Sequence, residues 1–389
     1  MNTRLSPSKH ILHVIATLDP AAGGPSDSVR VLLNFGPSGY TGEVVCLDDP
    51  NASFLVDYPC PVHALGPQTS TFGYNQRLSA WLVAHRDRFD GVIVNGLWQY
   101  CGLATWRAVR KHKPYVVFTH GMLDPYFKRA FPLKHAKKWA YWLFAEYWVL
   151  RDAFRVLFTT DEESRLAQQS FWLHRWRGFV VPFGANRPPS HQAGAREAFF
   201  HQCPYARDRR FLLFLGRIHR KKGCDLLIEA FSKHAARDPE LHLVMAGPDQ
   251  QAWSAGLKAL VDAAGLSDRV HWPGMLHGEV KWGALFACEA FILPSHQENF
   301  GIAVAEALGC GKAVLLADKV NIAPEIAQDG AGLMESDTQT GTDNLLARWA
   351  AMSPAARAAM EAQALETFDR RYDMQTNAAK ILRVFEEVE

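Results

Sequence analysis

Short apolar runs alternate with longer helix-like segments along the first half of the chain. The apolar runs are ILHVIATL, GEVVCL, GVIVNG, YVVFTHG, RVLFTT and GFVVPFG, at residues 11–18, 42–47, 91–96, 115–121, 155–160 and 178–184. Helix-like segments such as residues 26–35 and 75–89 lie between them. Continuous apolar strands joined by helices predict a parallel sheet that is covered on both faces.

The same alternation restarts after a stretch rich in Pro, Gly, Asn and Ser near residues 184–195, which we interpret as a linker. Strand-like runs follow at residues 211–217, 242–248, 269–274, 290–295 and 312–319, with helix-like connections at 225–238, 253–265 and 301–309. We therefore predict an α/β protein with two Rossmann-like domains facing across a cleft. The predicted bounds are 1–188 and 189–370, with a C-terminal helix at 371–389 that returns to the first domain.

Length and composition support two soluble domains and exclude several classes of partner. The chain has 389 residues, enough for two separate cores, and its formal net charge of +2 argues against nucleic acid as the main partner. Seven scattered cysteines without a CxxC pair or clustered histidines predict no metal site and a reducing compartment. The run at 11–18 contains His13 and lacks a cleavage site, so we expect a first strand, not a signal peptide, and a cytoplasmic protein.

Residues 134–151, KHAKKWAYWLFAEYWVLR, are basic at their start and then aromatic and apolar. The apolar part contains Glu146 and is too short to span a bilayer. Two interpretations remain open for this stretch. It is either a buried helix of the first domain or a peripheral contact with the inner face of a membrane through Lys134, Lys137, Lys138 and the aromatic residues.

Three segments have the residue types of a phosphate and sugar site. Gly23 and Gly24 follow the first strand and open a helix, where backbone amides can approach a phosphate, although a plain tight turn is the alternative. Arg217 and Lys222 lie at the end of a strand, where a guanidinium and an ammonium can neutralise a diphosphate, although a solvated cluster of surface cations, with Arg220 and Lys221, is the alternative. Neither segment has the dinucleotide-binding fingerprint or the Walker A spacing.

The third segment, PSHQENFGIAVAEALGC, places Glu298 and Glu306 on either side of an Asn-Phe-Gly turn. Such a turn points backbone N–H groups outward, and carboxylates accept hydrogen bonds from ribose and sugar hydroxyls. A carboxylate that only stabilises its helix dipole is the alternative for either glutamate. We therefore expect a ligand with a diphosphate and hydroxylated rings.

Together these motifs resemble a known family. Gly-Gly after the first strand, HGMLDP after a middle strand, the GR-x4-KG segment and the E-x7-E motif are similar to those of GT-B glycosyltransferases of family 4, retaining enzymes that use nucleotide sugars. The resemblance covers essentially the whole chain. It implies a GT-B fold with an N-terminal acceptor-binding domain and a C-terminal donor-binding domain.

The resemblance also implies residue roles. Arg217 and Lys222 grip the donor diphosphate, and Glu306 holds the ribose. Glu298 faces the donor sugar beside the backbone amides of Asn299, Phe300 and Gly301. His120 lies near the transferred sugar as the second catalytic residue, and Gly23 and Gly24 approach the phosphates. Asp124 of HGMLDP has no implied role, and we expect it to form a turn.

The implied activity is retaining, metal-independent transfer of a sugar from a UDP- or GDP-sugar to a hydroxyl of a glycan or lipid-linked acceptor, without a cofactor, in polysaccharide or glycolipid biosynthesis. The base is expected near residues 272–276. Two alternatives remain open: an isomerase or epimerase of the same fold that acts on nucleotide sugars, and an inactive nucleotide-sugar-binding protein. The donor sugar, the acceptor, the linkage and the oligomeric state do not follow from the sequence.

Overall fold

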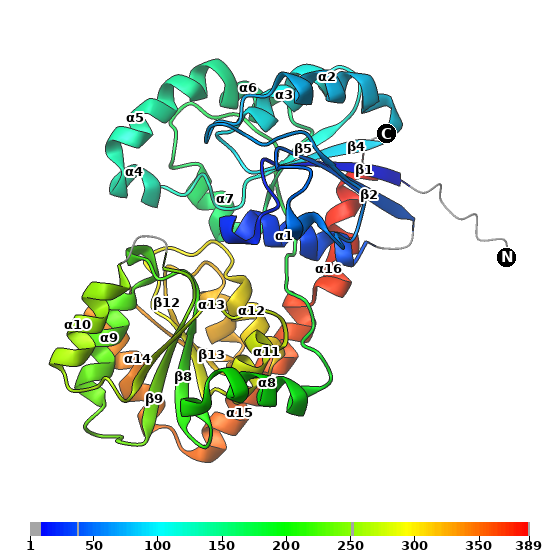
Figure 1. Ribbon diagram of the computed structural model, residues 1–389. Coiled ribbons are helices and arrows are strands. Elements are labelled where there is room, and N and C mark those ends of the chain that lie inside the picture. The colour runs from blue at the N-terminus through cyan, green and yellow to red at the C-terminus, as the bar shows by residue number, and fades with distance from the viewer. Residues whose placement is uncertain (1–8, 37–38, 250–252, 388–389) are drawn as a thin grey trace. The chain divides into compact units, whose positions relative to one another are not determined.

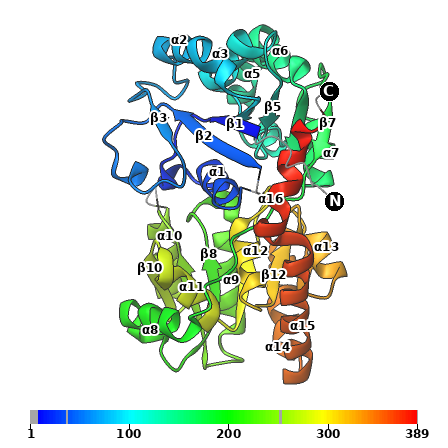
Figure 2. The ribbon, with the colours of Figure 1, turned by 90° about the vertical axis from the view of Figure 1, so that its right-hand side faces the viewer.

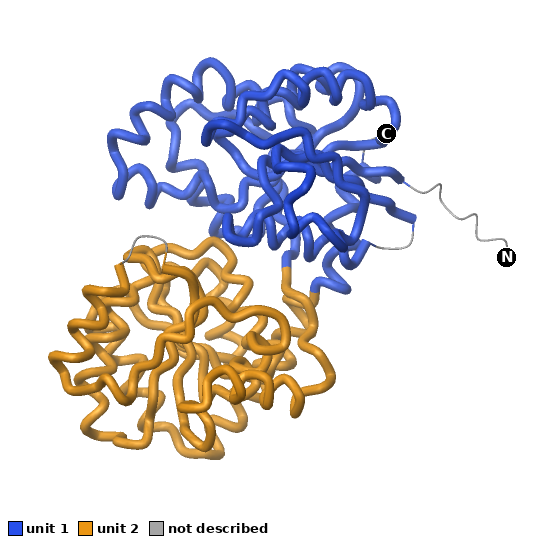
Figure 3. Tube along the Cα trace, viewed as in Figure 1, with its two compact units in different colours: residues 1–183, 374–389 blue, residues 184–373 orange. Residues whose placement is uncertain are grey.

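The computed structural model describes residues 9–36, 39–249 and 253–387. It divides the chain into two compact units, which Figure 3 distinguishes by colour. Unit 1 contains the chain before Gly184 and after Asp373, and unit 2 contains residues 184–373. The sequence placed the corresponding boundaries at 188/189 and 370/371.

Unit 1 is built on a seven-stranded sheet with the strand order β3-β2-β1-β4-β5-β6-β7, and every pairing is parallel. Its strands are β1 (Lys9–Val14), β2 (Tyr40–Cys46), β3 (Val62–Ala64), β4 (Gly91–Asn95), β5 (Tyr115–Phe118), β6 (Arg155–Phe158) and β7 (Gly178–Val180). The strand order reverses between β1 and β4, which is where parallel sheets open a crevice for ligands.

Helices cover both faces of this sheet (Figures 1 and 2). They are α1 (Gly24–Asn34), α2 (Gln76–His85), α3 (Tyr100–Val109), α4 (Tyr126–Ala130), α5 (Pro132–Tyr141), α6 (Tyr147–Asp152), α7 (Asp161–Ala167) and α16 (Met374–Leu382). A π-helical turn, η4 (Trp142–Glu146), joins α5 to α6. The C-terminal helix is held to unit 1 by Asn377, whose Nδ2 donates to the Phe183 carbonyl at 3.1 Å.

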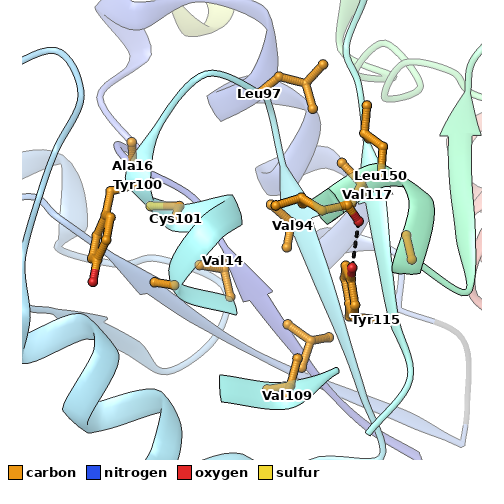
Figure 4. Close-up of a cluster of buried hydrophobic side chains, with 14 of the residues drawn as sticks. Val14, Ala16, Val94, Leu97, Tyr100, Cys101, Val109, Tyr115, Val117 and Leu150 are labelled. Atoms are coloured by element: carbon orange, nitrogen blue, oxygen red, sulfur yellow. Dashed lines mark hydrogen bonds between the residues drawn. The ribbon is translucent and has the colours of Figure 1, made fainter. Parts of the chain in front are cut away.

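The core of unit 1 forms because its central strands are apolar on both faces. All five residues of β4 are buried, and Val94 packs with Val14 of β1 and Val117 of β5 in the cluster shown in Figure 4. Tyr115 is buried there with its hydroxyl donating to the Val149 carbonyl at 2.5 Å. Burying the phenol therefore leaves no unpaired donor inside the core.

Unit 2 has a six-stranded parallel sheet of order β10-β9-β8-β11-β12-β13. Its strands are β8 (Arg210–Leu215), β9 (Leu241–Ala246), β10 (Val270–Gly274), β11 (Ala290–Leu293), β12 (Val314–Ala317) and β13 (Gly332–Glu335). The order reverses between β8 and β11, and the carboxyl ends of strands at such a switch point are where open parallel sheets generally bind ligands. Both parallel sheets and both Rossmann-like units confirm the fold that the sequence predicts.

The helices of unit 2 are again divided between the two faces of the sheet (Figure 1). They are α8 (Gln192–Gln202), α9 (Cys224–His234), α10 (Ser254–Ala263), α11 (Gly278–Ala287), α12 (Ile302–Gly309), α13 (Ala323–Gln328), α14 (Gln339–Ala351) and α15 (Pro354–Thr367). A π-helical turn, η7 (Phe368–Tyr372), ends α15. Within the described ranges, no helix is both long and apolar enough to cross a membrane.

The predicted stretch 134–151 falls in α5, η4 and α6, and one of its side chains is an unusual core residue. Glu146 is 1% exposed; its Oε2 accepts a hydrogen bond from the Trp98 backbone N–H at 3.1 Å, and its Oε1 has no partner among the described residues. Burial raises the pKa of Glu146 from 4.5 to about 7, although Trp98 N–H and Lys138 oppose the shift. The folded protein therefore binds a proton here that the unfolded chain releases.

We expect this carboxyl to make unit 1 less stable as the pH rises. Between pH 4.5 and 7 the folded state binds more protons at Glu146 than the unfolded state, so the free energy of unfolding falls with pH and levels off above pH 7. Glu146→Gln removes this titration. Its free energy of unfolding should rise relative to that of wild type by about 2 kcal/mol between pH 5 and pH 8, as measured by urea unfolding monitored by tryptophan fluorescence. A difference that does not change with pH would contradict the prediction.

Candidate functional site

The loop that follows β8 lies directly against the backbone that leaves β11. This loop contains a short helical turn, η6 (Arg220–Lys222), which ends at Gly223. Gly223 has φ 64°, and a Cβ atom there would lie 2.0 Å from the Pro294 carbonyl oxygen. Only glycine permits both the left-handed conformation and this close approach. These two constraints explain why the GR-x4-KG segment ends in a glycine.

Hydrogen bonds join the two segments along their length. The Lys221 carbonyl accepts from the His296 backbone N–H at 2.8 Å and from Ser295 Oγ at 2.9 Å. The Lys221 ammonium donates to Gln297 Oε1 at 2.8 Å. His219 caps η6 by accepting from the Lys221 N–H through Nδ1 at 3.0 Å. The position of η6 is thus fixed by the strand end beside it.

This arrangement brings Lys222 and Glu298 into contact. Their side chains form an ion pair and are 12% and 16% exposed. Burial, followed by the nearby Lys221 and Arg217 cations, lowers the pKa of Lys222 well below its ordinary value. The contact with Glu298 favours the charged ammonium and opposes that shift. The sequence named both residues but did not predict that they pair.

Arg217 stands at the exit of β8 and is exposed. It forms no ion pair with a residue in the described ranges. Its charge is nevertheless close enough to contribute to the shift at Lys222. The strand end therefore displays one exposed guanidinium beside one partly buried ammonium, a pair of cations suited to an anionic ligand.

The Asn-Phe-Gly turn begins α12. Gly301 has φ 79° and precedes the first helical residue, Ile302. Phe300 is only 6% exposed, and its ring packs edge-on against Tyr372 with 5.7 Å between centroids. Asn299 Oδ1 accepts from Asn321 Nδ2 at 3.4 Å. The Phe300 side chain is therefore a packing residue that holds the turn against Tyr372.

Glu306 lies on α12, 7% exposed, and its Oε1 accepts from the Lys281 ammonium at 2.5 Å. Lys281 is on α11 and was not among the predicted site residues. No local feature of its helix identifies it, because its partner is 25 positions later in the chain. The two glutamates of the E-x7-E motif are thus each paired with a lysine.

In unit 1, Gly23 and Gly24 begin α1 at the carboxyl end of β1. Gly23 has φ 92°, which requires glycine, whereas Gly24 does not have a left-handed conformation. A Cβ atom at either position would meet nothing within 4 Å. The space beside both residues is therefore open, and packing gives no reason for the second glycine.

His120 follows β5 at the same edge of the sheet and has the unusual φ of 47°. Its ring stacks on Phe118 with centroids 4.4 Å apart, and Nε2 donates to Asn95 Oδ1 at 3.3 Å. Burial, with a smaller contribution from His13, lowers the pKa of His120 to about 3. The imidazole is therefore neutral at physiological pH, with Nδ1 as its acceptor nitrogen.

Asn95 was not predicted as a site residue, although it ends the apolar run of β4. Its Nδ2 lies 3.5 Å from His13 Nδ1 and donates to the Ile93 carbonyl at 3.3 Å. Asp124 forms the expected turn, because its Oδ1 accepts from the Tyr126 backbone N–H at 2.7 Å. Among the residues that the structure describes, no group of three His, Cys, Asp or Glu side chains has the arrangement of a metal site.

Comparison with known proteins places these residues in a family. The "Glycosyl transferases group 1" model matches residues 196–365, and the "Glycosyl transferase 4-like domain" model matches residues 29–184. The chain is 31% identical over 176 residues to D-inositol 3-phosphate glycosyltransferase of Geodermatophilus obscurus, which covers 43% of this chain and 39% of that protein. The alignments span 39%, 44% and 53% of three such curated relatives.

Solved structures share the fold over nearly the whole chain. Sucrose-phosphate synthase of Thermosynechococcus elongatus has a TM-score of 0.75 at 20% identity, covering 98% of this chain and 99% of that one. Anabaena HepE in complex with UDP-glucose has a TM-score of 0.77 at 19% identity, covering 97% and 100%. At this identity the likeness concerns the fold alone. With the two family models matched in adjoining halves, the chain belongs to the GT-B glycosyl transferases of group 1, family 4.

Proposed function

We propose that the protein transfers a sugar, with retention at the anomeric carbon, from a nucleoside-diphosphate sugar to a hydroxyl of a glycan or lipid-linked acceptor. The observation that carries this proposal is the pair of cations at the end of β8, Arg217 and Lys222, beside the carboxylates of the E-x7-E motif. A phosphate leaving group needs positive charge, and hydroxylated rings need acceptors. Both lie at the switch point of one sheet.

In this proposal Arg217 and Lys222 bind the donor diphosphate and stabilise the charge that develops as it leaves. The charges are in place before the ligand arrives, because η6 is fixed against the end of β11. Preorganised charges contribute more to a transition state than charges that must reorient. These two cations supply the positive charge in a mechanism that we propose to be independent of metal ions and of cofactors.

The carboxylates of α12 and its preceding turn bind the hydroxyl groups. Glu306 holds the ribose, with Lys281 fixing one of its oxygens so that the other faces the ligand. Glu298 faces the donor sugar beside the backbone amides of Asn299, Phe300 and Gly301. The base lies near residues 272–276, at the end of β10 on the same sheet edge. UDP-glucose, present in the HepE complex, is the first donor to test.

Unit 1 supplies His120 near the reacting carbon and the Gly23–Gly24 turn for the phosphates. The neutral His120 accepts a hydrogen bond from a sugar hydroxyl through Nδ1, because Nε2 is engaged by Asn95. No carboxylate of unit 1 or unit 2 is assigned as a nucleophile. We therefore infer attack from the face that the phosphate leaves, which retains the configuration. Proton NMR of the new glycosidic bond tests this directly.

Two other activities fit parts of the site. An isomerase or epimerase of the same fold would convert a nucleotide sugar without an acceptor, and an inactive binding protein would bind it without product. Incubation of a nucleotide sugar with and without glycan acceptors distinguishes all three. The relative named as D-inositol 3-phosphate glycosyltransferase and the neighbour named as sucrose-phosphate synthase favour transfer.

We also propose a peripheral membrane contact on the cytoplasmic side through the outward face of the α5–η4–α6 helix. Leu133 and Phe144 are 82% and 83% exposed, and Trp148 and Leu143 lie on the same helix. Lys134 and Lys137 are exposed beside them. Lys138 was expected to join this face, but its ammonium lies 4.3 Å from the centre of the Trp98 ring. Apolar side chains flanked by lysines suit an anionic lipid surface.

Removal of either diphosphate cation should slow transfer strongly. Arg217→Ala or Lys222→Ala is expected to cost about 2–4 kcal/mol of transition-state stabilisation, a decrease in kcat/KM of roughly 30-fold to 1,000-fold. Lys233→Ala, which removes an exposed lysine on α9, is the matched control and should leave the rate unchanged.

The same assays in excess EDTA should retain wild-type turnover. Near-normal rates in both site variants, or loss in EDTA restored by Mg²⁺, would contradict the proposal.

Glu306 and His120 should affect different kinetic constants. A ribose contact is made equally in the ground and transition states. Glu306→Ala should therefore weaken donor binding by about 1.5–3 kcal/mol and raise the donor KM accordingly. His120→Ala should bind donor normally but lower kcat. Steady-state kinetics and calorimetry with UDP measure both, with the exposed Glu279→Ala on α11 as control. Loss of nucleotide binding in His120→Ala with binding kept in Glu306→Ala would reverse the assignment.

The membrane contact should depend on the two most exposed apolar side chains of this helix. Leu133→Ser with Phe144→Ser should weaken binding to phosphatidylserine vesicles at least about tenfold, because each side chain contributes roughly 1.5–3 kcal/mol when fully buried. Raising the salt concentration should weaken wild-type binding. Leu260→Ser, an exposed leucine on α10, is the control. Absence of wild-type co-sedimentation at low salt would contradict the proposal.

A further inference from the structure

The turn that presents His120 has a strained backbone. His120 and Gly121 both have positive φ values, 47° and 74°. A non-glycine residue in this region costs roughly 1–3 kcal/mol and persists only where its surroundings hold it. Hydrogen bonding of the imidazole to Asn95 fixes the ring, but it does not fix the backbone of the turn. The Met122 backbone N–H closes the turn on the Thr119 carbonyl at 3.0 Å, and a buried carboxylate adds further contacts to its two sides.

Glu163, in the first turn of α7, makes these contacts. Its Oε1 accepts from Thr119 Oγ1 at 2.6 Å and from the Gly121 backbone N–H at 2.7 Å, the two residues that flank His120. Its Oε2 accepts from the backbone N–H and the hydroxyl of Thr159 at 2.7 and 2.8 Å, at the end of β6. One carboxylate therefore binds the ends of two neighbouring strands through four donors.

The chemistry of this contact is specific to a carboxylate. Glu163 is 4% exposed, and no cation in the described ranges pairs with it. Its charge is balanced by the four donors, and charge-assisted hydrogen bonds of this kind are shorter and stronger than neutral ones. An amide would replace one acceptor oxygen by an NH₂ group, which would face two donors. A glutamine can therefore fill the space without holding the turn.

We propose that Glu163 is a positioning residue for the reaction: it holds the Thr119–Gly121 turn and thereby keeps His120 in place at the reacting centre. The kinetic part rests on the role proposed above for His120. The alternative is that Glu163 only joins β5 to β6 and contributes to stability. The two differ in whether the effect of Glu163 requires the His120 side chain.

A double-mutant cycle separates them. Glu163→Gln should lower kcat about tenfold to a hundredfold, the range expected when a reacting group is displaced, and leave the affinity for UDP unchanged. In a His120→Ala background the same change should lower kcat less than twofold. Glu162→Gln is the matched control, because the Glu162 side chain is 38% exposed and forms an ion pair with Arg165 on the same helix. The proposal would be overturned if Glu163→Gln lowered kcat by the same factor in the wild-type and His120→Ala backgrounds. It would also be overturned if the variant lost UDP affinity by as large a factor as it lost kcat.

A measurement without turnover tests the positioning independently. In ¹⁵N-histidine-labelled protein, the signals of His120, identified by their loss in His120→Ala, should report one Nε2–H tautomer in wild type and Glu162→Gln. In Glu163→Gln they should shift toward an average of both tautomers. Unchanged signals overturn the proposal even if the protein is an active transferase, whereas an inactive wild type with this shift refutes only the transfer activity. If Glu163→Gln does not fold, Thr119→Val, which removes one of the four donors, replaces it with the same expected and overturning results.

Discussion

The contact between Gly223 and the Pro294 carbonyl is the constraint on which the cation site at the end of β8 depends. A Cβ atom at position 223 would lie 2.0 Å from that oxygen, so any other residue would push η6 away from the end of β11. The hydrogen bonds of Lys221 to Ser295 and His296 would be lost with it, and Lys222 would leave Glu298. The electrostatics of the site therefore follow from a backbone contact at the switch point of the sheet.

That contact explains why the Lys222–Glu298 pair exists before any ligand is bound, and a second lysine–glutamate pair, Lys281–Glu306, joins α11 to α12. Lys222 and Glu306 are both largely buried, and an unpaired charge there would be costly. Glu298 and Lys281 neutralise them in place. Under the proposed function, an incoming diphosphate carries about two negative charges and competes with Glu298 for Lys222, so part of its attraction to Lys222 only replaces the existing ion pair. Arg217, which has no such partner among the described residues, then makes the larger new interaction.

Sequence reasoning succeeded where the signal is local. The buried runs of β1, β4, β8 and β11, and the Asn-Phe-Gly turn before α12, are recognisable from neighbouring residues alone. The strands β3 and β13 were missed because neither is a continuous apolar run: β3 reads VHA, with a histidine at its centre, and β13 reads GLME, with a glycine at its start and a glutamate at its end. Both units and the parallel sheets followed from the alternation of runs.

The missed site residues depend on distant parts of the chain. Lys281 belongs to the site because it forms an ion pair with Glu306, which is on a different helix. Glu163 is the last of three consecutive acidic residues, Asp161, Glu162 and Glu163, and only the position of the turn after β5 decides which of them is buried. Lys138 was grouped with Lys134 and Lys137 by sequence, yet the Trp98 loop, forty positions earlier, determines where its ammonium lies. Such contacts are long-range, and spacing along the chain does not reveal them.

The two units use charge in opposite ways under the proposed function. In unit 2 the cations face the ligand, and Coulomb attraction falls only as the inverse of distance, so a small displacement costs little. In unit 1 the side chain at the reacting centre is neutral, since the pKa of His120 is about 3, and it acts by hydrogen bonding. A hydrogen bond weakens steeply with angle and with tenths of an ångström. The demand for rigidity is therefore greater in unit 1, where the Glu163 carboxylate binds the ends of β5 and β6 through two backbone N–H groups and two threonine hydroxyls.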